Sequence, residues 1–530
     1  MKPAASTPRS SATSLSALLR NPVWQVVIAL VGSVLLYWVG IGSAGFSGTE
    51  GHRAIPAYHM LDEGEWLVPH LFGRPYLRKP PGMPWAIAGA SELLGRTEFA
   101  ARSVSALAAT LSVMVSLWFG RRWFGPWGGL YAGMGQLLMP VFWLTSRSAD
   151  IESLHNLGVQ IAGLVLVDRA IDRRSGGVVP SIGAALAIAG GLFVAGITKG
   201  PSGAAALGAC LVTPLLMARS VRPLLKPAIL GGILVGGAAL TIVFWQIVQR
   251  GQELGAHTVT QTVDEFLWAT DQWWRVLLLG PTSLVMALPA SLAMLYPWGP
   301  DAIAEDRQSI AVRHPLALPA ARSLTLAVLL ALGVLTVAGV SNPRYTMPAQ
   351  ILIAPIAGYF GLGMHGAFIL KRPGIARVMM LGHPAVLVIG LAVAAAVALP
   401  MSEARRERVS GEAAGAEIAA CVPEGARIIS DHLVEARPDV LWYASAAGSA
   451  GERRVVWLPL AKGPFELTHG DYLVLRDDAL TGELESLARG PLPWTLQEVG
   501  NGSVYRFSFR VMRVLADQAV AGQPLEGGSP

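Results

Sequence analysis

The sequence predicts a polytopic α-helical membrane protein. Hydrophobic residues make up 52% of the 530 residues and charged residues only 14%, whereas a soluble domain carries about 25% charge. The apolar residues also gather into long runs without a charged side chain, such as Val23–Trp38 and Ala228–Trp245. A helix needs roughly 20 mostly apolar residues to cross a bilayer, and lipid offers backbone amides no partner outside a helix. These runs therefore indicate spanning helices and exclude an ordinary soluble fold.

The apolar runs define about eleven predicted spans and one transmembrane domain over residues 1–400. The first run follows basic residues, as in a signal peptide, but it is long and no small-residue cleavage site follows it. We therefore interpret it as a retained span. Of the two cysteines, Cys210 lies in an apolar run and Cys421 in a polar segment, so no disulfide is expected. The predicted spans are roughly 22–44, 100–119, 126–145, 153–168, 180–197, 202–218, 228–248, 276–298, 322–340, 347–364 and 378–400.

Basic residues predict the orientation of these spans. Lys and Arg are enriched in cytoplasmic loops, and every second loop here is basic, for example at Arg121 and Arg122. The intervening short loops carry about one basic residue each: Arg147, Lys199 and Arg344. This pattern puts the N-terminus in the cytoplasm and residues 401–530 outside it. The net charge of +6 therefore reflects membrane topology, and no nucleic-acid partner is expected.

The C-terminal region differs in composition from the rest of the chain. Residues 401–521 carry more charge and short β-type runs around a helical stretch at Asp478–Ala488. We expect a small extracytoplasmic α/β domain there, followed by a disordered tail over residues 522–530. The predicted strands are Ala426–Ser430, Val455–Leu458, Tyr472–Leu475 and Ser503–Phe509.

The first outer loop, residues 45–99, is rich in polar and ionisable groups at a membrane surface, which usually mark function. Three runs stand out in order: Met60-Leu-Asp-Glu-Gly-Glu-Trp-Leu-Val-Pro-His-Leu, Gly73-Arg-Pro-Tyr-Leu-Arg-Lys-Pro-Pro and Phe99-Ala-Ala-Arg-Ser-Val-Ser-Ala-Leu. Together they resemble the superfamily of protein O-mannosyltransferases and lipid A aminoarabinose transferases, with the aminoarabinose branch more similar. The resemblance is strong over residues 45–155, weaker through the later spans and only architectural beyond them. It implies a GT-C glycosyltransferase fold and a polyprenyl-phosphate sugar donor.

Glu50 is the candidate general base. The resemblance implies an acidic residue just after the first span, usually in an Asp-Glu pair, but this chain has Thr49-Glu50. An acceptor hydroxyl is a poor nucleophile until a positioned base removes its proton. The alternative interpretation is that Glu50 only caps the segment that follows it. Thr49 therefore leaves open whether Glu50 or another acid is the base.

Lys79, within Arg78-Lys79-Pro80-Pro81, matches the lysine that contacts phosphate in the resembling family. A cation there would stabilise the charge that develops on a polyprenyl-phosphate leaving group. The alternative is an interfacial basic patch of Arg74, Arg78 and Lys79 that faces lipid headgroups. His52 and Arg53 are candidate neighbours: Arg53 for the donor phosphate, and His52 for the acceptor or a metal.

Three later outer turns carry further candidates. Glu152 matches a second acid of the family, with Asp150 as the alternative; either would orient the acceptor or hold a divalent metal. Glu152 is equally consistent with a helix N-terminal charge. Lys199 and Arg344 resemble further phosphate-facing cations, although Lys199 could instead be a lysine that reaches along a turn to the membrane surface. The predicted topology puts these residues, Glu50 and Lys79 on one membrane face.

These features predict an inverting glycosyltransferase of the bacterial inner membrane. Glu50 would activate an acceptor hydroxyl at the periplasmic face, and Lys79 would bind the donor phosphate. A transporter or flippase of a lipid-linked sugar is the alternative, although the ionisable residues gather at one face and no inverted repeat is evident. A non-catalytic scaffold would leave the acid and lysine pattern without a role. The donor sugar, metal dependence, oligomeric state and acceptor, whether lipid A, another lipid, a glycan or a protein, stay open.

Overall fold

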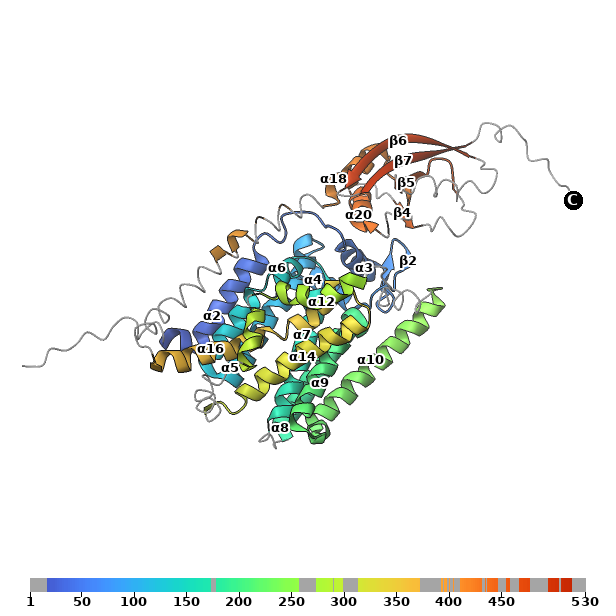
Figure 1. Cartoon of the computed structure of the whole chain (residues 1–530). Helices are drawn as coiled ribbons and strands as arrows, with labels where there is room; N and C mark the ends of the chain where they lie inside the picture. The colour runs from blue at the N-terminus through green and yellow to red at the C-terminus, as the bar shows by residue number, and fades with distance from the viewer. Residues whose placement is uncertain are drawn as a thin grey trace, which may run out of the picture. The chain divides into compact units, whose positions relative to one another are not determined.

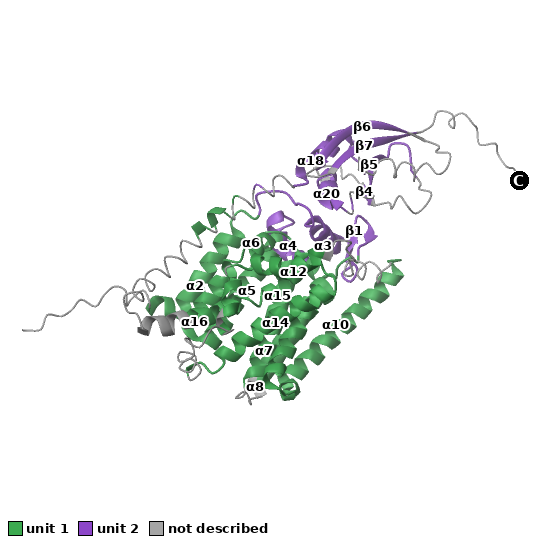
Figure 2. Ribbon diagram, viewed as in Figure 1, with its two compact units in different colours: residues 1–41, 77–86, 102–400 green, residues 42–76, 87–101, 401–530 purple. Residues whose placement is uncertain are grey.

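The computed structural model describes two compact units, which Figure 2 shows in different colours. Unit 1 comprises residues 1–41, 77–86 and 102–400, and unit 2 comprises residues 42–76, 87–101 and 401–530. The predicted span 378–400 lies almost wholly outside the described residues, as do the predicted helix Asp478–Ala488 and the predicted tail 522–530. The described residues are 17–172, 178–256, 273–288, 290–298, 313–371, 410–430, 437–446, 454–457, 467–476, 494–504 and 507–516, with a few isolated positions between them.

Unit 1 is a helical bundle (Figure 1). Short 3₁₀ turns interrupt it, among them η2 (Gly200–Gly203), η4 (Ala290–Trp298) and η6 (Pro343–Thr346). The helix α4 (Gly82–Leu94) runs from unit 1 into unit 2. The helices of unit 1 are α2 (Pro22–Ser33), continued by the π-helix Val34–Trp38, α5 (Glu98–Leu137, whose first residues belong to unit 2), α6 (Pro140–Ser146), α7 (Ile151–Ile171), α8 (Val178–Lys199), α9 (Ala204–Ala218), α10 (Pro227–Glu253), α12 (Trp273–Met286), α14 (Ala317–Val337), α15 (Met347–Gln350) and α16 (Ala354–Lys371).

Four helical segments of the described residues are long and apolar enough to cross a membrane. They are Glu98–Leu137, Ser181–Ala218, Pro227–Glu253 and Ala317–Val337. The first covers the whole predicted span 100–119 and part of the predicted span 126–145. It is broken at Gly125, whose φ of 75° and ψ of −170° are not helical. Glycine is the residue that adopts such a conformation without strain. The polytopic membrane class is confirmed, and the count of eleven spans stays a prediction.

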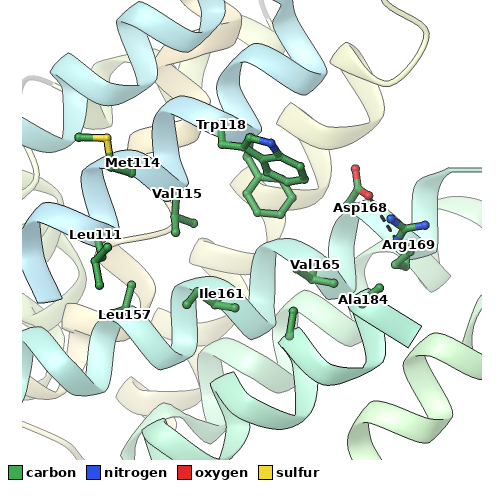
Figure 3. A pocket seen from close by; sticks show the side chains of 13 residues that line it. Leu111, Met114, Val115, Trp118, Leu157, Ile161, Val165, Asp168, Arg169 and Ala184 are labelled. Atoms are coloured by element: carbon green, nitrogen blue, oxygen red, sulfur yellow. Dashed lines mark ion pairs between the residues drawn. The ribbon is translucent and has the colours of Figure 1, made fainter. Parts of the chain in front are cut away.

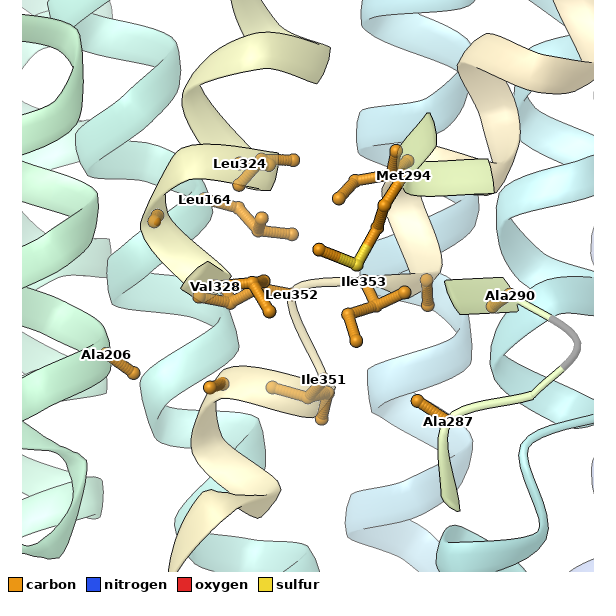
Figure 4. Packing of buried hydrophobic residues seen from close by; sticks show 14 of the residues in the cluster. Leu164, Ala206, Ala287, Ala290, Met294, Leu324, Val328, Ile351, Leu352 and Ile353 are labelled. Atoms are coloured by element: carbon orange, nitrogen blue, oxygen red, sulfur yellow. The ribbon is translucent and has the colours of Figure 1, made fainter. Parts of the chain in front are cut away.

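The core of unit 1 consists of small and branched apolar side chains. Leu164, Met294, Leu324 and Ile353 pack together at its centre (Figure 4), and many of their neighbours are alanines. Small residues let helices approach closely in a membrane, where packing replaces the hydrophobic effect as the main attraction.

The helices α7 and α8 approach each other closely at two glycines. A β-carbon added at Gly158 would lie 2.7 Å from the Ala195 nitrogen, and one added at Gly191 would lie 2.6 Å from the Gly158 oxygen. Only glycine leaves room for this backbone-to-backbone contact. The contact brings the first turn of α7 beside the last turn of α8.

Unit 2 contains a five-stranded sheet with the order β4-β3-β5-β7-β6. β3 (Arg427–Ser430) pairs in parallel with β4 (Arg454–Trp457) and β5 (Tyr472–Arg476), while β7 (Phe507–Ala516) pairs antiparallel with β5 and β6 (Trp494–Val504). The prediction of one strand over Ser503–Phe509 is wrong, because Ser503 and Val504 end β6 and residues 507–509 begin β7, and the two strands pair antiparallel. The helices α18 (Glu412–Cys421) and α20 (Pro438–Ala446) complete the C-terminal part.

The first outer loop shares a hydrophobic core with the C-terminal residues of unit 2. The loop supplies α3 (Gly51–Glu63) and a small hairpin of β1 (His70–Leu71) and β2 (Arg74–Pro75). Ile55 and Leu71 from the loop belong to the same buried cluster as Ile418 from α18 and Val440 and Leu441 from α20. The structure therefore joins part of loop 45–99 to residues beyond 400.

Candidate active site

The first turn of α7 carries two carboxylates. Asp150 is the N-cap, with an extended backbone, and its side chain accepts a hydrogen bond of 2.8 Å from the Ile151 amide. This contact satisfies one of the helix's unpaired N–H groups, and acids here are favoured by the helix dipole. Glu152 lies in the same turn and is buried. Its side chain, however, is bound by groups from elsewhere in unit 1.

Glu152 forms a buried ion pair with Lys199, the last residue of α8. The Lys199 Nζ lies 2.7 Å from each carboxylate oxygen of Glu152, and the two side chains are only 4% and 3% exposed. Lys199 Nζ also lies 4.8 Å from the centre of the Tyr345 ring, within the range of a cation–π contact. The lysine is thus held inside the protein instead of reaching a lipid surface.

Arg344 completes a network of two acids and two cations. It lies in η6, where the side chain of Asn342 accepts a hydrogen bond of 3.0 Å from the Arg344 amide. Its guanidinium contacts the Asp150 carboxylate and lies 3.5 Å from Glu152 through Nε. The charge of Asp150 raises the pKa of Arg344 against the opposing effect of burial, so the guanidinium stays charged. The side chain is 42% exposed, which leaves it accessible to a ligand.

The loop that carries Lys79 packs against the same end of α8. A β-carbon added at Gly82 would lie 2.6 Å from the Ile197 oxygen, so the backbone after Lys79 touches α8 just before Lys199. Lys79 itself is partly buried. Unit 1 therefore brings together Asp150, Glu152, Lys199 and Arg344 and places the Lys79 loop beside them.

The other candidates, Glu50, His52 and Arg53, lie in unit 2. Glu50 is 2% exposed and is the N-cap of α3, but its side chain makes no capping hydrogen bond to that helix. It accepts instead from the Ser47 amide at 2.9 Å and from the Ser47 hydroxyl at 3.2 Å. The Glu50 side chain therefore does not cap α3, and the alternative interpretation of Glu50 as a helix cap is not supported. Because Glu50 and Lys79 belong to different units, their approach to one donor stays a prediction.

Arg53 is a buried cation that forms few hydrogen bonds with the described residues. It is 7% exposed, its Nη1 donates 3.3 Å to the His52 carbonyl, and its Nε has no hydrogen-bond partner there. A buried charge without partners is costly, so an anion bound at Arg53 would be stabilised. The neighbouring His52 ring lies 5.6 Å from the Tyr76 ring.

His155 is a site residue that the sequence analysis missed. Its Nδ1 donates 2.9 Å to the Ala195 carbonyl, and its Nε2 accepts 3.0 Å from the Ser202 hydroxyl. These two contacts lie on either side of Lys199 along the chain, so His155 holds that turn. The available signal was its spacing of three residues from Glu152, which puts both on one helix face. No cluster of three metal-binding side chains occurs among the residues with described positions.

An apolar cavity of about 520 Å³ lies between α5, α7 and α8 (Figure 3). Its lining includes Leu111, Trp118 and Leu157, with the ion pair of Asp168 and Arg169 at one end. Leu157 is five residues beyond Glu152, about 8 Å along the helix axis. The cavity therefore begins more than one helical turn beyond Glu152 and extends along α7 away from it.

Comparison with known proteins finds one family model and several curated relatives that each match part of the chain. Residues 78–246 match the family model described as dolichyl-phosphate-mannose-protein mannosyltransferase. An undecaprenyl phosphate-alpha-4-amino-4-deoxy-L-arabinose arabinosyl transferase from Aeromonas salmonicida is 36% identical over 74 residues, 14% of each chain. A second transferase of this name, from Pseudomonas fluorescens, is 32% identical over 157 residues, 29% of this chain and 26% of that protein. The matches thus span well under two thirds of these relatives.

Solved structures show the same fold over nearly the whole chain. ArnT from Cupriavidus metallidurans bound to undecaprenyl phosphate aligns with a TM-score of 0.65 and 17% identity, covering 93% of this chain and 98% of ArnT. Its apo state aligns with a TM-score of 0.62 and 18% identity, covering 95% and 98%. Together with the family model and the curated relatives, these likenesses show that the chain has the polytopic helical membrane fold of the GT-C glycosyltransferases and resembles them in sequence over part of its length.

Proposed function

We propose that this protein transfers a sugar from a polyprenyl-phosphate donor to an acceptor hydroxyl at the extracytoplasmic membrane face, with inversion at the anomeric carbon. The observation that carries the proposal is the buried network of Asp150, Glu152, Lys199 and Arg344, with the Lys79 loop packed beside it. The similar ArnT structure holds undecaprenyl phosphate, and the matching relatives are named for an undecaprenyl-phosphate-linked sugar. Both facts support a lipid-phosphate donor.

The cations of this network would receive the donor phosphate. Asp150 and Glu152 balance the charges of Arg344 and Lys199. Arg344 is the more exposed cation, so the phosphate would take up part of the position that Asp150 now occupies. Charge-assisted hydrogen bonds to phosphate oxygens are short and strong. Lys79 and Arg53 would add positive charge where the bond to the leaving group breaks.

Glu152 is held too firmly by a cation to act as the base, which leaves Glu50, the acid that the family resemblance assigns. Both oxygens of Glu152 face the Lys199 ammonium. A carboxylate bound by a cation gives its lone pairs less readily to a new proton. Glu50 would remove the acceptor proton as the hydroxyl oxygen attacks the anomeric carbon. The bond from that carbon to the phosphate oxygen would break at the same time, and Glu152 would keep Lys199 in place.

The cavity between α5, α7 and α8 would hold part of the polyprenyl chain. Its lining is mainly apolar, and hydrocarbon gains free energy when it leaves water for such a surface. Residues 401–530 would lie outside the cytoplasm and the N-terminus inside it. The acceptor would be a lipid, a glycan or a protein.

A transfer assay tests the proposal. The purified protein in lipid nanodiscs would receive radiolabelled undecaprenyl-phosphate sugars and candidate acceptors. Because a general acid or base contributes about 10²–10⁴-fold, we expect Glu50→Gln to lose at least 100-fold in rate. We expect Lys79→Ala to lose activity as well. The matched control for the acid is Glu63→Gln, which removes one carboxylate from the same helix α3 at a partly exposed position. The control for the cation is Arg250→Ala on α10, whose side chain is 41% exposed.

The outcomes separate the alternatives. If wild type and both site variants transfer sugar equally well, the site assignment is wrong. If Glu152→Gln abolishes transfer and Glu50→Gln does not, Glu152 is the base. If wild type transfers no sugar but moves a labelled lipid-linked sugar across a vesicle membrane, the protein is a transporter.

A further inference from the structure

A second acidic group lies next to Glu50 in unit 2, and it comes from the C-terminal part of the chain. Asp439, in the first turn of α20, is 0% exposed, and Arg437 is 2% exposed. Two hydrogen bonds join them, from Arg437 Nε to Asp439 Oδ1 at 3.0 Å and from Nη2 to Oδ2 at 2.7 Å. Asp and Arg side chains are almost never buried so completely unless they are paired.

The turn that carries Glu50 packs directly on this pair. A β-carbon added at Gly51 would lie 2.8 Å from the Asp439 nitrogen, and one added at Gly411 would lie 2.5 Å from Asp439 Oδ2. The backbone that follows Glu50 therefore touches the backbone of Asp439. No larger residue fits at Gly51 without moving one of the two.

The segment before Glu50 is fixed to the same C-terminal residues. The Gly411 amide donates 3.0 Å to the Phe46 carbonyl, and the Phe46 amide donates 2.6 Å to the Tyr443 hydroxyl. Ser47 pairs with Ser410 as an isolated antiparallel bridge. Glu50 thus lies between two anchors, the bridge at Ser47 and the contact at Gly51.

The charges of Glu50 and Asp439 interact. Burial raises the pKa of Asp439 to about 6, Arg437 opposes this shift, and the negative charge of Glu50 adds to it. Asp439 therefore accepts a proton near pH 6, and above that pH its charged form pairs with Arg437. Two other acids border the turn: Glu412 approaches Gly45, and Glu98 accepts 2.5 Å from the Tyr443 hydroxyl.

We propose that Asp439, oriented by Arg437, is a positioning residue that holds the Glu50 turn in its reactive conformation. The proposal rests on the function proposed above, in which Glu50 is the base. It gives the C-terminal part of unit 2 a direct role in the reaction. Within residues 45–52, Glu50 is the sole acid, so the second carboxylate of this part of the site comes from α20.

The test compares kcat with the KM for donor in sugar transfer by the full-length protein in nanodiscs, at a pH well above 6, where Asp439 is charged. Asp439→Asn weakens the pairing with Arg437 that fixes the start of α20 against the Glu50 turn. We therefore expect kcat to fall at least tenfold while the KM for donor changes little. Asp439→Glu keeps the charge and should restore much of the wild-type kcat. Asp62→Asn is the matched control, since Asp62 pairs with Arg96 at an exposed position of α3.

A second variant tests the contact without removing a charge. Gly51→Ala would place a β-carbon against the Asp439 backbone and displace Glu50, so kcat should fall at least tenfold while the KM for donor changes little. This variant decides the question if Asp439→Asn fails to fold. An Asp439→Asn enzyme with the wild-type kcat, or one whose loss appears in the KM for donor, overturns the proposal, and so does a Gly51→Ala enzyme with unchanged kcat.

Failure of this inference differs from failure of the proposed function. If wild type transfers sugar and Glu50→Gln does not, an Asp439→Asn enzyme with the wild-type kcat refutes the positioning role alone. If wild type transfers no sugar at all, the proposed function is refuted and this inference with it.

Discussion

The stability of the buried pair between Glu152 and Lys199 follows from its geometry. Lys199→Met would remove the ammonium that lies 2.7 Å from both Glu152 oxygens, in a place where the two side chains are only 4% and 3% exposed. Breaking a buried pair by removing one partner costs about 3–5 kcal/mol, because the other charge stays buried. Arg344 Nε remains 3.5 Å from Glu152. We therefore expect a loss near the lower limit, about 3 kcal/mol.

A double-mutant cycle in mixed micelles measures this loss. Unfolding of Lys199→Met, Glu152→Gln and the double variant would be followed by tryptophan fluorescence against added SDS. The double variant should lose at least about 2 kcal/mol less than the sum of the single losses, because neither charge is then left alone. The control is Arg250→Ala, which breaks an exposed pair with Glu253 at 2.9 Å and should cost under about 0.5 kcal/mol.

A single clear result would refute this reasoning. If Lys199→Met costs less than about 1 kcal/mol, as for an exposed pair, the pair is not shielded from water. Strict additivity in the cycle would lead to the same conclusion.

Three further predictions follow from individual contacts. Ala184→Trp would fill the cavity between α5, α7 and α8 and should raise the KM for a long-chain donor but not for a short prenyl donor; an equal rise for both would contradict a lipid site. Gly82→Ala would put a β-carbon 2.6 Å from the Ile197 oxygen and should lower kcat/KM at least tenfold, and unchanged kinetics would disprove the contact. Because burial raises the pKa of Asp439 to about 6, the folded protein binds more protons than the unfolded chain between about pH 4 and 6, so stability should fall as pH rises through this window. Unfolding at several pH values should show that Asp439→Asn lacks this slope.

The membrane class could be predicted because long apolar runs without charge are typical of spanning helices and rare in soluble domains. The predicted spans 228–248 and 322–340 correspond to α10 (Pro227–Glu253) and α14 (Ala317–Val337). Hydropathy could not predict whether a segment forms an α-helix or a 3₁₀ helix. The predicted span 276–298 is divided into α12 and the 3₁₀ segment η4. Hydropathy depends on side-chain polarity and carries no information on which type of helix the backbone adopts.

Part of the candidate site could be predicted because the distribution of basic residues indicates which loops lie on the same membrane face. Glu152, Lys199 and Arg344 come from three separate turns that the basic-loop pattern placed on one face, and the structure brings them into contact. Asp439 was missed because its partner Gly51 is distant in sequence, and a single sequence contains no pairing information for such segments.

The strands of unit 2 show a similar limit. The alternation in Ser503–Phe509 is typical of one strand, while Asn501-Gly502, a common hairpin turn, lies inside β6. The alternation of side chains carries no information on which strands pair. In the structure, Ser503 pairs with Ser508 and Val504 with Phe507, so the run belongs to two strands.

The common core of the first loop and the last strands has a consequence for biosynthesis. Phe46 and its partner Tyr443 are 397 residues apart, so at about 5–20 residues per second the ribosome needs about 20 to 80 s to deliver the second after the first. Throughout that interval Ile55 and Leu71 lack the side chains that bury them. A message cut short before residue 410 would therefore yield a polypeptide whose membrane helices could insert while the Glu50 turn has nothing to fold against.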